Sequence, residues 1–390
     1  MGGPVGSPED AAATYGLGAS EAALVGQAAL LARDQVAPQA ALWERERRIG
    51  HEALQAAAAL GLTRLQVPLA AGGLGASFAC KAALAEVLAG ADFGFTMSWI
   101  NTHNVAAKLA LDAPAALATR YLPDLISARR LGCTALTEPG AGSDFAAITT
   151  QATRCDGGWR IEGAKAWITN AAQADVVVLY AQTEPGSGGQ GIACFLIDGQ
   201  RPGFVREPAF ALGGQHSIGT GGFRLDGYQA SSDEMLHPPG QAFKAALVSI
   251  NGARTYIAAM CCGMVADALR VALAHGRQRR SFGQPLAGHQ GWRWRLAECA
   301  SELAACRLMV AQAARQIDAG QDAQLIAAQA KLLATRLADR QLPLLLQAMG
   351  AEGLREQHPF ARHLLGARVA GFVDGSTEML LERISAHLAR

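Results

Sequence analysis

The chain has 390 residues, half of them hydrophobic, and its 34 basic and 33 acidic residues give a formal net charge of +1. A chain of this length can bury a sizeable core in two or three domains, and abundant Ala and Leu suit a helix-rich globular protein. The balanced, dispersed charge argues against nucleic acid or an anionic membrane as partner. No run reaches the ~18 uninterrupted apolar residues of a membrane span.

Residues 1–20 lack the basic start and apolar centre of a signal peptide, and we expect their beginning to be disordered. The cysteines form no Cys-x-x-Cys pair, so we expect reduced thiols in a cytoplasmic enzyme, each buried as a small apolar side chain, and no metal site. They are Cys80, Cys133, Cys155, Cys194, Cys261, Cys262, Cys299 and Cys306.

Three textures follow one another along the chain. Residues 20–131 show helical apolar spacing, with a helix start at Ala19 and a stop at Pro38, and predict an N-terminal helical domain. Residues 132–239 contain short alternating or β-branched runs separated by Gly, Pro and Asp, which predict a middle antiparallel β domain. Residues 240–390 return to long Ala/Leu-rich runs, which predict a C-terminal four-helix bundle. The predicted fold class is therefore α+β.

Two short segments of the β region carry groups that suit a ligand. In "ALTEPGAGSDFAAITTQA", which begins at residue 135, Gly140 and Gly142 let backbone approach a ligand closely, while Thr137 and Ser143 supply hydroxyls. One strand-length later, "GAKAWITNAAQAD" places a large aromatic residue, Trp167, just before a hydroxyl. Taken alone, the first segment is more typical of an ordinary turn, and Trp167 is more typical of a core aromatic residue.

Two segments of the helical C-terminal part complete a pattern. They are "RQRRSFGQPLAGHQ" at 277–290 and "QAMGAEG" at 347–353. In this order, the four segments resemble those of the acyl-CoA dehydrogenase family of flavoproteins, with Ala351 in place of a second Gly. The resemblance extends from about residue 20 to the C-terminus, and it implies that family's helical–β–helical fold.

The resemblance implies FAD as cofactor, bound without a Rossmann signature. The Thr169 hydroxyl or amide would lie near N5, which gains electron density in the reaction. Arg279 and Phe282 would reach the pyrophosphate and adenine of a neighbouring subunit's FAD, which implies a homodimer or homotetramer. Without the resemblance, Arg279 would equally suit a solvated basic run. The implied FAD residues are Thr137, Ser143, Trp167, Thr169, Arg279, Phe282, Gln290, Gln347, Gly350, Gly353 and Ser376.

A carboxylate just before the last predicted helix is the candidate catalytic base. The segment "AGFVDGSTEMLLERIS" places Asp374 where the family usually has Glu-Gly-Thr, and Asp reaches ~1.5 Å less far. Asp is also a preferred helix N-cap, so this alternative stays open. Ala253, before Arg254, excludes a second position that carries the base in some relatives, and we expect Glu378 to face solvent. Ser143, Arg254 and Gly375 are implied to contact the substrate.

The implied reaction is FAD-dependent α,β-dehydrogenation of an acyl thioester, with Asp374 as the base that removes the α-proton and FAD N5 as the hydride acceptor. The thioester could be carried on CoA or on a carrier protein, and an electron-transferring flavoprotein is the expected acceptor. A related flavin-dependent monooxygenase and a non-catalytic paralogue are the alternatives. The sequence leaves the acyl group and the pathway open. His103, near the start of the expected substrate pocket, is expected to be a hydrogen-bonded structural residue.

Overall fold

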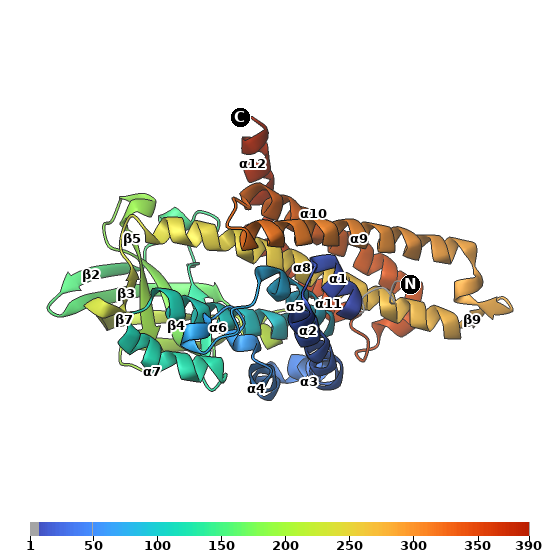
Figure 1. Cartoon of the computed structure of the whole chain (residues 1–390), viewed down its shortest axis with the longest axis horizontal. Helices are drawn as coiled ribbons and strands as arrows, with labels where there is room; N and C mark the ends of the chain where they lie inside the picture. Colours follow the sequence, from blue (N-terminus) through green and yellow to red (C-terminus); the bar gives the residue numbers. More distant parts are fainter. Residues whose placement is uncertain (1–7, 49, 390) are drawn as a thin grey trace.

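The computed structural model describes residues 8–48 and 50–389. The molecule is elongated, with a β sheet at one end, helices at the centre, and a small hairpin at the other end (Figure 1). This order of helices, sheet and helices confirms the predicted fold class. The extent of each part as an independent domain stays a prediction.

The N-terminal part is helical. Its α-helices are α1 (Pro8–Tyr15), α2 (Ala19–Leu31), α3 (Ala37–Glu46), α4 (His51–Ala59), α5 (Phe78–Ala91), α6 (Phe93–Asp112) and α7 (Ala115–Ile126). Part of the stretch before residue 20 thus forms α1, while residues 1–7, where disorder was expected, lie outside the described part. Tyr15 anchors α1 in the core through its hydroxyl, which lies 3.0 Å from Glu86 Oε2.

The predicted helix stop at Pro38 is wrong. The helix continues through a π-helical turn at Ala32–Val36 directly into α3, where Pro38 lies in the first turn. Proline is tolerated there because the first N–H groups of a helix have no partner within it, and the π turn separates α3 from the preceding ladder. The chain instead leaves the helix at Arg47, which adopts a left-handed conformation with φ 52°.

The middle part is a sheet in the order β6-β7-β3-β2-β4-β5-β8, with β1 added beside β4. Most pairs are antiparallel, as predicted, but β1 runs parallel to β4, and β2 meets β4 in parallel at one residue pair. The strands are β1 (Leu131–Ala135), β2 (Gln151–Cys155), β3 (Gly158–Ile168), β4 (Ala174–Gln182), β5 (Ile192–Asp198), β6 (Phe204–Ala209), β7 (Gly221–Ser231) and β8 (Met235–His237).

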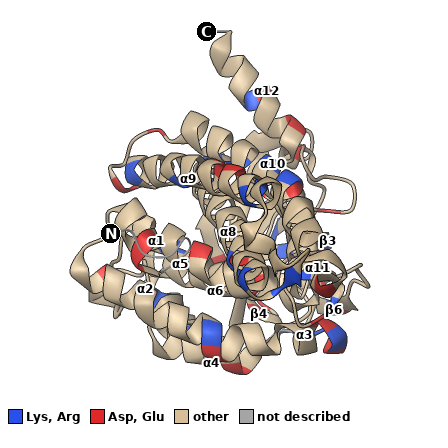
Figure 2. Cartoon of the chain, turned by 90° about the vertical axis from the view of Figure 1, so that its right-hand side faces the viewer, with Lys and Arg blue, Asp and Glu red and all other residues tan. Residues whose placement is uncertain are grey.

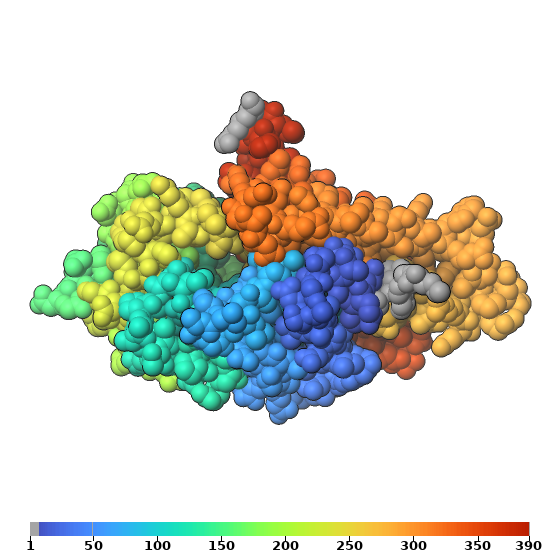
Figure 3. Space-filling view, viewed as in Figure 1, coloured from blue at the N-terminus to red at the C-terminus, as the bar shows by residue number. Residues whose placement is uncertain are grey.

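The C-terminal part consists of long helices and a short hairpin. Its elements are α8 (Ala242–Gln278), β9 (Arg280–Ser281), β10 (Gln284–Pro285), α9 (Gln290–Asp318), α10 (Gln324–Met349), α11 (Phe360–Phe372) and α12 (Thr377–Leu388). The helix α11 was not predicted. The helix α12 stands out from the body of the molecule, and Leu380 is its one buried residue (Figures 1 and 3).

The largest core joins the N-terminal helices to α8, α9 and α10. By length and composition, α8 alone among the described helices could cross a membrane, but 72% of its most apolar window is buried inside the molecule, as in a core helix. All eight cysteines are free; seven are buried as predicted. Cys155 is exposed because it ends strand β2 beside the turn to β3, so burial was the wrong prediction for it.

Candidate active site

A buried ion pair joins the first two motifs. Lys165 Nζ on β3 lies 2.9 Å from Glu138 Oε1 and also donates to the Leu136 carbonyl, while the amides of Thr149 and Thr150 donate to the same carboxylate. Burial alone would raise the pKa of Glu138, but Lys165 and these donors hold it at about 2. Burial lowers the pKa of Lys165 to about 8 against the attraction of Glu138. Both groups are therefore charged at neutral pH, and the pair fixes the turn onto the strand.

The two motifs meet at an open aromatic face. The Ala166 amide donates to the Thr137 carbonyl at 3.1 Å, so Thr137 lies beside Trp167. Trp167 is 59% exposed and has a left-handed backbone with φ 63°, an uncommon conformation for a bulky residue. Its ring packs edge-on against Phe210, with the ring centroids 4.9 Å apart. Thr169 is partly exposed and Ser143 is exposed. An exposed indole with hydroxyls nearby fits a flat aromatic group such as a flavin.

Residues 373–375 form a strained turn, which we call the base turn. Asp374 has φ 53° and Gly375 has φ 97°, both in the left-handed region. Lys331 on α10 donates to the carbonyls of Val373 and Gly375, and Arg254 on α8 donates through Nε to the Asp374 carbonyl at 3.3 Å. Two buried cations therefore hold all three carbonyl groups of the base turn.

Asp374 does not cap the last helix. Ser376 is the N-cap of α12, and its hydroxyl accepts from the Met379 amide at 3.5 Å. In the part of the chain that the structure describes, the Asp374 carboxylate makes no hydrogen bond and its amide has no acceptor. Burial raises the pKa of Asp374, and the charges of Lys331 and Arg254 oppose that rise. The carboxylate is therefore a partly buried group without a structural partner, which suits a base. Glu378 is exposed, as predicted.

Arg254 lies against the base turn. Its Nη1 also approaches Asn251 Oδ1 at 3.3 Å, and its side chain is almost wholly buried. The structure thus gives this residue a backbone contact that the sequence did not predict. Its contact with a substrate stays a prediction, as does that of Gly375.

Apart from Ser376, which caps α12 beside the base turn, the remaining predicted cofactor residues lie towards the end of the molecule opposite the sheet. Arg279 and the 95% exposed Phe282 lie on the β9–β10 hairpin, which Figure 1 shows far from the sheet that carries Trp167. Trp292 Nε1 donates to the Ala348 carbonyl at 3.2 Å, which joins the start of α9 to the end of α10. This contact brings the region of Gln290 together with the turn that contains Gln347, Gly350 and Gly353. Within one chain, the predicted FAD residues other than Ser376 therefore form two separate groups.

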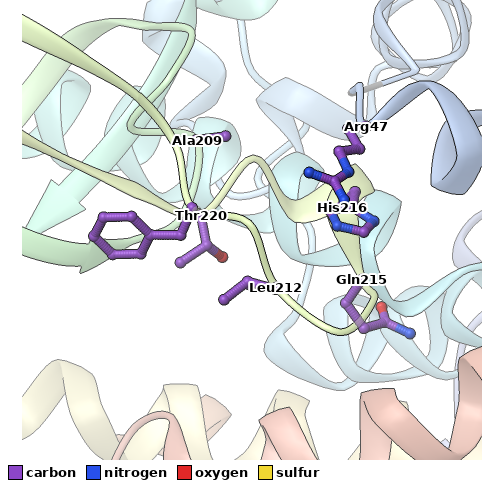
Figure 4. Close-up of a pocket in the computed structure, with 7 residues that line it drawn as sticks. Arg47, Ala209, Leu212, Gln215, His216 and Thr220 are labelled. Carbon is purple, nitrogen blue, oxygen red and sulfur yellow. The ribbon is translucent and has the colours of Figure 1, made fainter.

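A small cavity of about 70 Å³ lies behind Phe210, between residues 209–220 and the end of α3. Figure 4 shows Arg47 and His216 beside each other there, and His216 Nδ1 lies 3.1 Å from Glu44 Oε1. None of the predicted site residues lines this cavity, which is too small for a flavin or a thioester. This cavity is therefore not the candidate site, which stays with the predicted residues around Trp167 and on the base turn.

The fold and the site define a class: a helical–β–helical protein with an open aromatic face and a carboxylate on a fixed turn. Family models of the acyl-CoA dehydrogenase N-terminal, middle and C-terminal domains match residues 19–129, 133–228 and 240–389. The mitochondrial short-chain specific acyl-CoA dehydrogenase of Bos taurus is 30% identical over 362 residues, which cover 92% of this chain and 87% of that protein. The chain belongs to the acyl-CoA dehydrogenase family.

Two solved structures show the same architecture. The glutaryl-coenzyme A dehydrogenase–glutaryl-CoA complex has a TM-score of 0.90 and 28% identity, and the match covers 96% of each chain. PigA with FAD and proline has a TM-score of 0.90 and 26% identity, and the match covers 96% of this chain and 98% of that one. The prediction of a flavin oxidoreductase that uses FAD is confirmed at the level of the family.

Sequence reasoning missed three of the charged residues that build the site: Glu138, Lys165 and Lys331. Glu138 and Lys165 lie inside the first two motifs, each with mostly small and apolar residues around it. That composition was a usable signal for a buried pair. Lys331 lies in an Ala/Leu-rich helix, where a lone Lys is indistinguishable from a solvated one.

Proposed function

We propose that this protein dehydrogenates an acyl thioester between Cα and Cβ, with Asp374 as the base. The observation that carries the proposal is the base turn: a partly buried carboxylate with no structural partner, on a backbone held by Lys331 and Arg254. Preorganised placement of a base is worth a large share of a proton-transfer barrier. A carboxylate that served only the fold would be expected to cap α12, and Ser376 does that.

The chain's own residues perform the first half of the reaction. Asp374 accepts the α-proton, and its backbone amide would donate to the thioester carbonyl and so stabilise the charge that develops on oxygen. The hydrogen on Cβ leaves with the electron pair of its C–H bond, as a hydride, while the Cα=Cβ double bond forms. When bound, FAD supplies the acceptor of that hydride. Thr137, Ser143, Trp167 and Thr169 would hold its ring and ribityl arm, and Ser376 the edge near the base turn.

The second group of predicted cofactor residues would serve a neighbouring chain, so we propose a homodimer or homotetramer. Support comes from the 95% exposed Phe282 and from the projecting α12, whose Leu381 and Leu388 are exposed. Large apolar side chains open to solvent mark surfaces that another chain covers. Charges of both signs are scattered over the face shown in Figure 2, with no single-sign field to oppose association.

We propose that the thioester is carried either on CoA or on a carrier protein, because both present the same pantetheine arm. An electron-transferring flavoprotein is the proposed acceptor and the cytoplasm the proposed location. The test is anaerobic loss of visible flavin absorbance when the purified protein meets a panel of short acyl thioesters, each on CoA and on pantetheine. Bleaching by at least one thioester supports the proposal. No bleaching, together with oxygen consumption on supplied reduced flavin, would favour the monooxygenase alternative instead.

A further inference from the structure

A buried lysine outside the predicted site lacks the carboxylate partner that the buried cations Lys165 and Arg307 have. Lys81 on α5 is 4% exposed, and its Nζ donates to Asn104 Oδ1 at 2.7 Å and Gln66 Oε1 at 3.0 Å. In the described part of the chain, no carboxylate lies within ion-pair distance of it. By contrast, Lys165 pairs with Glu138, and Arg307 pairs with Glu86 at 2.5 Å. Burial lowers the pKa of Lys81 to about 7, with no acidic group opposing the change.

An amine in such surroundings is costly to the fold. Two amide oxygens satisfy two of its three hydrogens, and the faces of Phe78 and Tyr256 lie 5.4 and 5.3 Å away. An apolar residue would fill the same space in the core without the cost of removing an amine from water. His103 adds a second polar group, with Nε2 3.3 Å from Gln66 Oε1. A buried polar group that stability does not require is a candidate for function.

The surroundings of Lys81 lead to the base turn. Asn104 Nδ2 lies 3.5 Å from the Tyr256 hydroxyl. Burial raises the pKa of Tyr256, and the negative charge of Asp374 raises it further, so that hydroxyl lies within electrostatic reach of the base. Tyr256 also follows Arg254 by two residues on α8, where Arg254 holds the Asp374 carbonyl. Lys81, Asn104 and Tyr256 therefore form a hydrogen-bonded polar file across α5, α6 and α8, and the charge of Asp374 on the base turn acts on its Tyr256 end.

We propose that Lys81 determines which acyl group the enzyme accepts, by binding an oxygen acceptor at the distal end of a short acyl chain, a carboxylate in preference to a hydroxyl. This inference rests on the proposed function, because it places the α-carbon at Asp374 and the distal end of the acyl group along the polar file. Lys81 has one hydrogen free for such a group. A methyl-terminated chain would leave the ammonium buried and unpaired, whereas a carboxylate would neutralise it.

The experiment compares four-, five- and six-carbon acyl thioesters that end in a methyl, hydroxyl, carboxylate or amino group, each on pantetheine and on CoA. The wild-type protein should bleach its flavin fastest with a carboxylate-ended chain, by about 10⁴-fold over the methyl-ended chain, as expected for a site built around a polar group. Lys81→Met should lose that preference or reverse it. Lys81→Gln keeps a hydrogen-bond donor without the charge, so it should still bleach its flavin with the hydroxyl-ended chain. Lys244→Met, the same change at an exposed lysine, should match the wild type.

Ligand-induced change in the thermal unfolding midpoint separates this inference from the proposed function. The carboxylate-ended thioester should raise the midpoint of the wild type and of Lys244→Met, but not of Lys81→Met. That selective shift without any bleaching would support the inference and count against dehydrogenation. Bleaching with the same substrate ranking in the wild type and Lys81→Met would overturn the inference and leave dehydrogenation standing. A wild type that prefers methyl-ended chains in both readouts would also overturn it.

Discussion

Replacing Lys331 with Met tests whether the base turn is held in place for catalysis. The Nζ of this fully buried lysine donates to the carbonyls on either side of Asp374. The substitution leaves both carbonyls without their donor, at about 1–3 kcal/mol each, or about 2–6 kcal/mol together. It also removes a buried ammonium. Burial lowers the pKa of Lys331 from 10.5 to about 8, which corresponds to about 3 kcal/mol that the fold no longer bears.

The two effects nearly cancel, so Lys331→Met should fold with a free energy of unfolding between about 1 kcal/mol higher and about 3 kcal/mol lower than the wild type. Catalysis has no such compensation. A base displaced by about 1 Å loses about 100-fold in rate, so flavin bleaching should slow by that order. The positive charge of Lys331 also opposes the raised pKa of Asp374. Without it, that pKa rises further, and the increase of the bleaching rate with pH should move to higher pH.

Denaturant unfolding measures the free energy of unfolding. Single-turnover anaerobic bleaching over a range of pH measures the catalytic rate and its pH dependence. Lys244→Met serves as the control, because that lysine is exposed and precedes Arg254 on α8 by ten residues, about 15 Å along the helix. The reasoning would be refuted by a Lys331→Met protein that bleaches at the wild-type rate with an unmoved pH profile. A variant that loses activity in proportion to its unfolded fraction would equally refute the positioning role.

Substitutions at three residues, Asp374, Glu138 and Arg279, probe the other parts of the site. Asp374→Asn should keep FAD and the fold but bleach its flavin at least ~100-fold more slowly, and bleaching at the wild-type rate would show that another group takes the proton. Asp374→Glu should also bleach more slowly, because the fixed backbone of the base turn cannot move back to make room for a longer side chain. Glu138→Gln should cost about 3–5 kcal/mol in denaturant unfolding and lower the FAD content, since it leaves Lys165 buried and unpaired, while Glu162→Gln on the exposed surface should cost almost nothing. Arg279→Ala should fold but lose FAD, unlike Arg277→Ala, and co-assembly with a Trp167→Ala chain should restore flavin to part of the sites; no restoration would count against a cofactor site shared between chains.

The order of the three parts could be read from the sequence because each texture reflects a different burial geometry. In a helix, apolar residues recur every three or four positions because one side of the helix is buried. In a strand, they alternate with polar residues because successive side chains point to opposite faces of the sheet. Signals carried by single residues, such as a helix stop at a proline, were less reliable. Proline breaks a helix only where a backbone N–H donor is needed. The π turn at Ala32–Val36 places Pro38 in the first turn of α3, where no such donor is needed. The exposed Cys155 shows the same limit, because average burial preferences do not apply at the end of strand β2, beside the turn into β3.

The role of Asp374 could not be decided from sequence alone, because Asp374 and Ser376 are both good N-caps within three residues of each other. The choice depends on the left-handed turn, which depends in turn on Lys331 and Arg254, 43 and 120 residues earlier in the chain. Asn and Asp tolerate that conformation better than most residues, which gives a physical reason for Asp here that is separate from reach. The shorter acid and the strained turn are therefore compatible features of one site.

The buried lysines of this fold differ in what offsets their burial. Lys165 has a carboxylate, and the result is a rigid link between two cofactor motifs. Lys331 has two backbone carbonyls and lies near Asp374, and the result is a fixed base. Lys81 has only amide oxygens, and it has the lowest of the three pKa values, about 7, because no acid stabilises its charged form. Selection for stability alone would remove such an amine. Its position at the far end of the polar file from Asp374 is the reason to expect that a negatively charged substrate completes it.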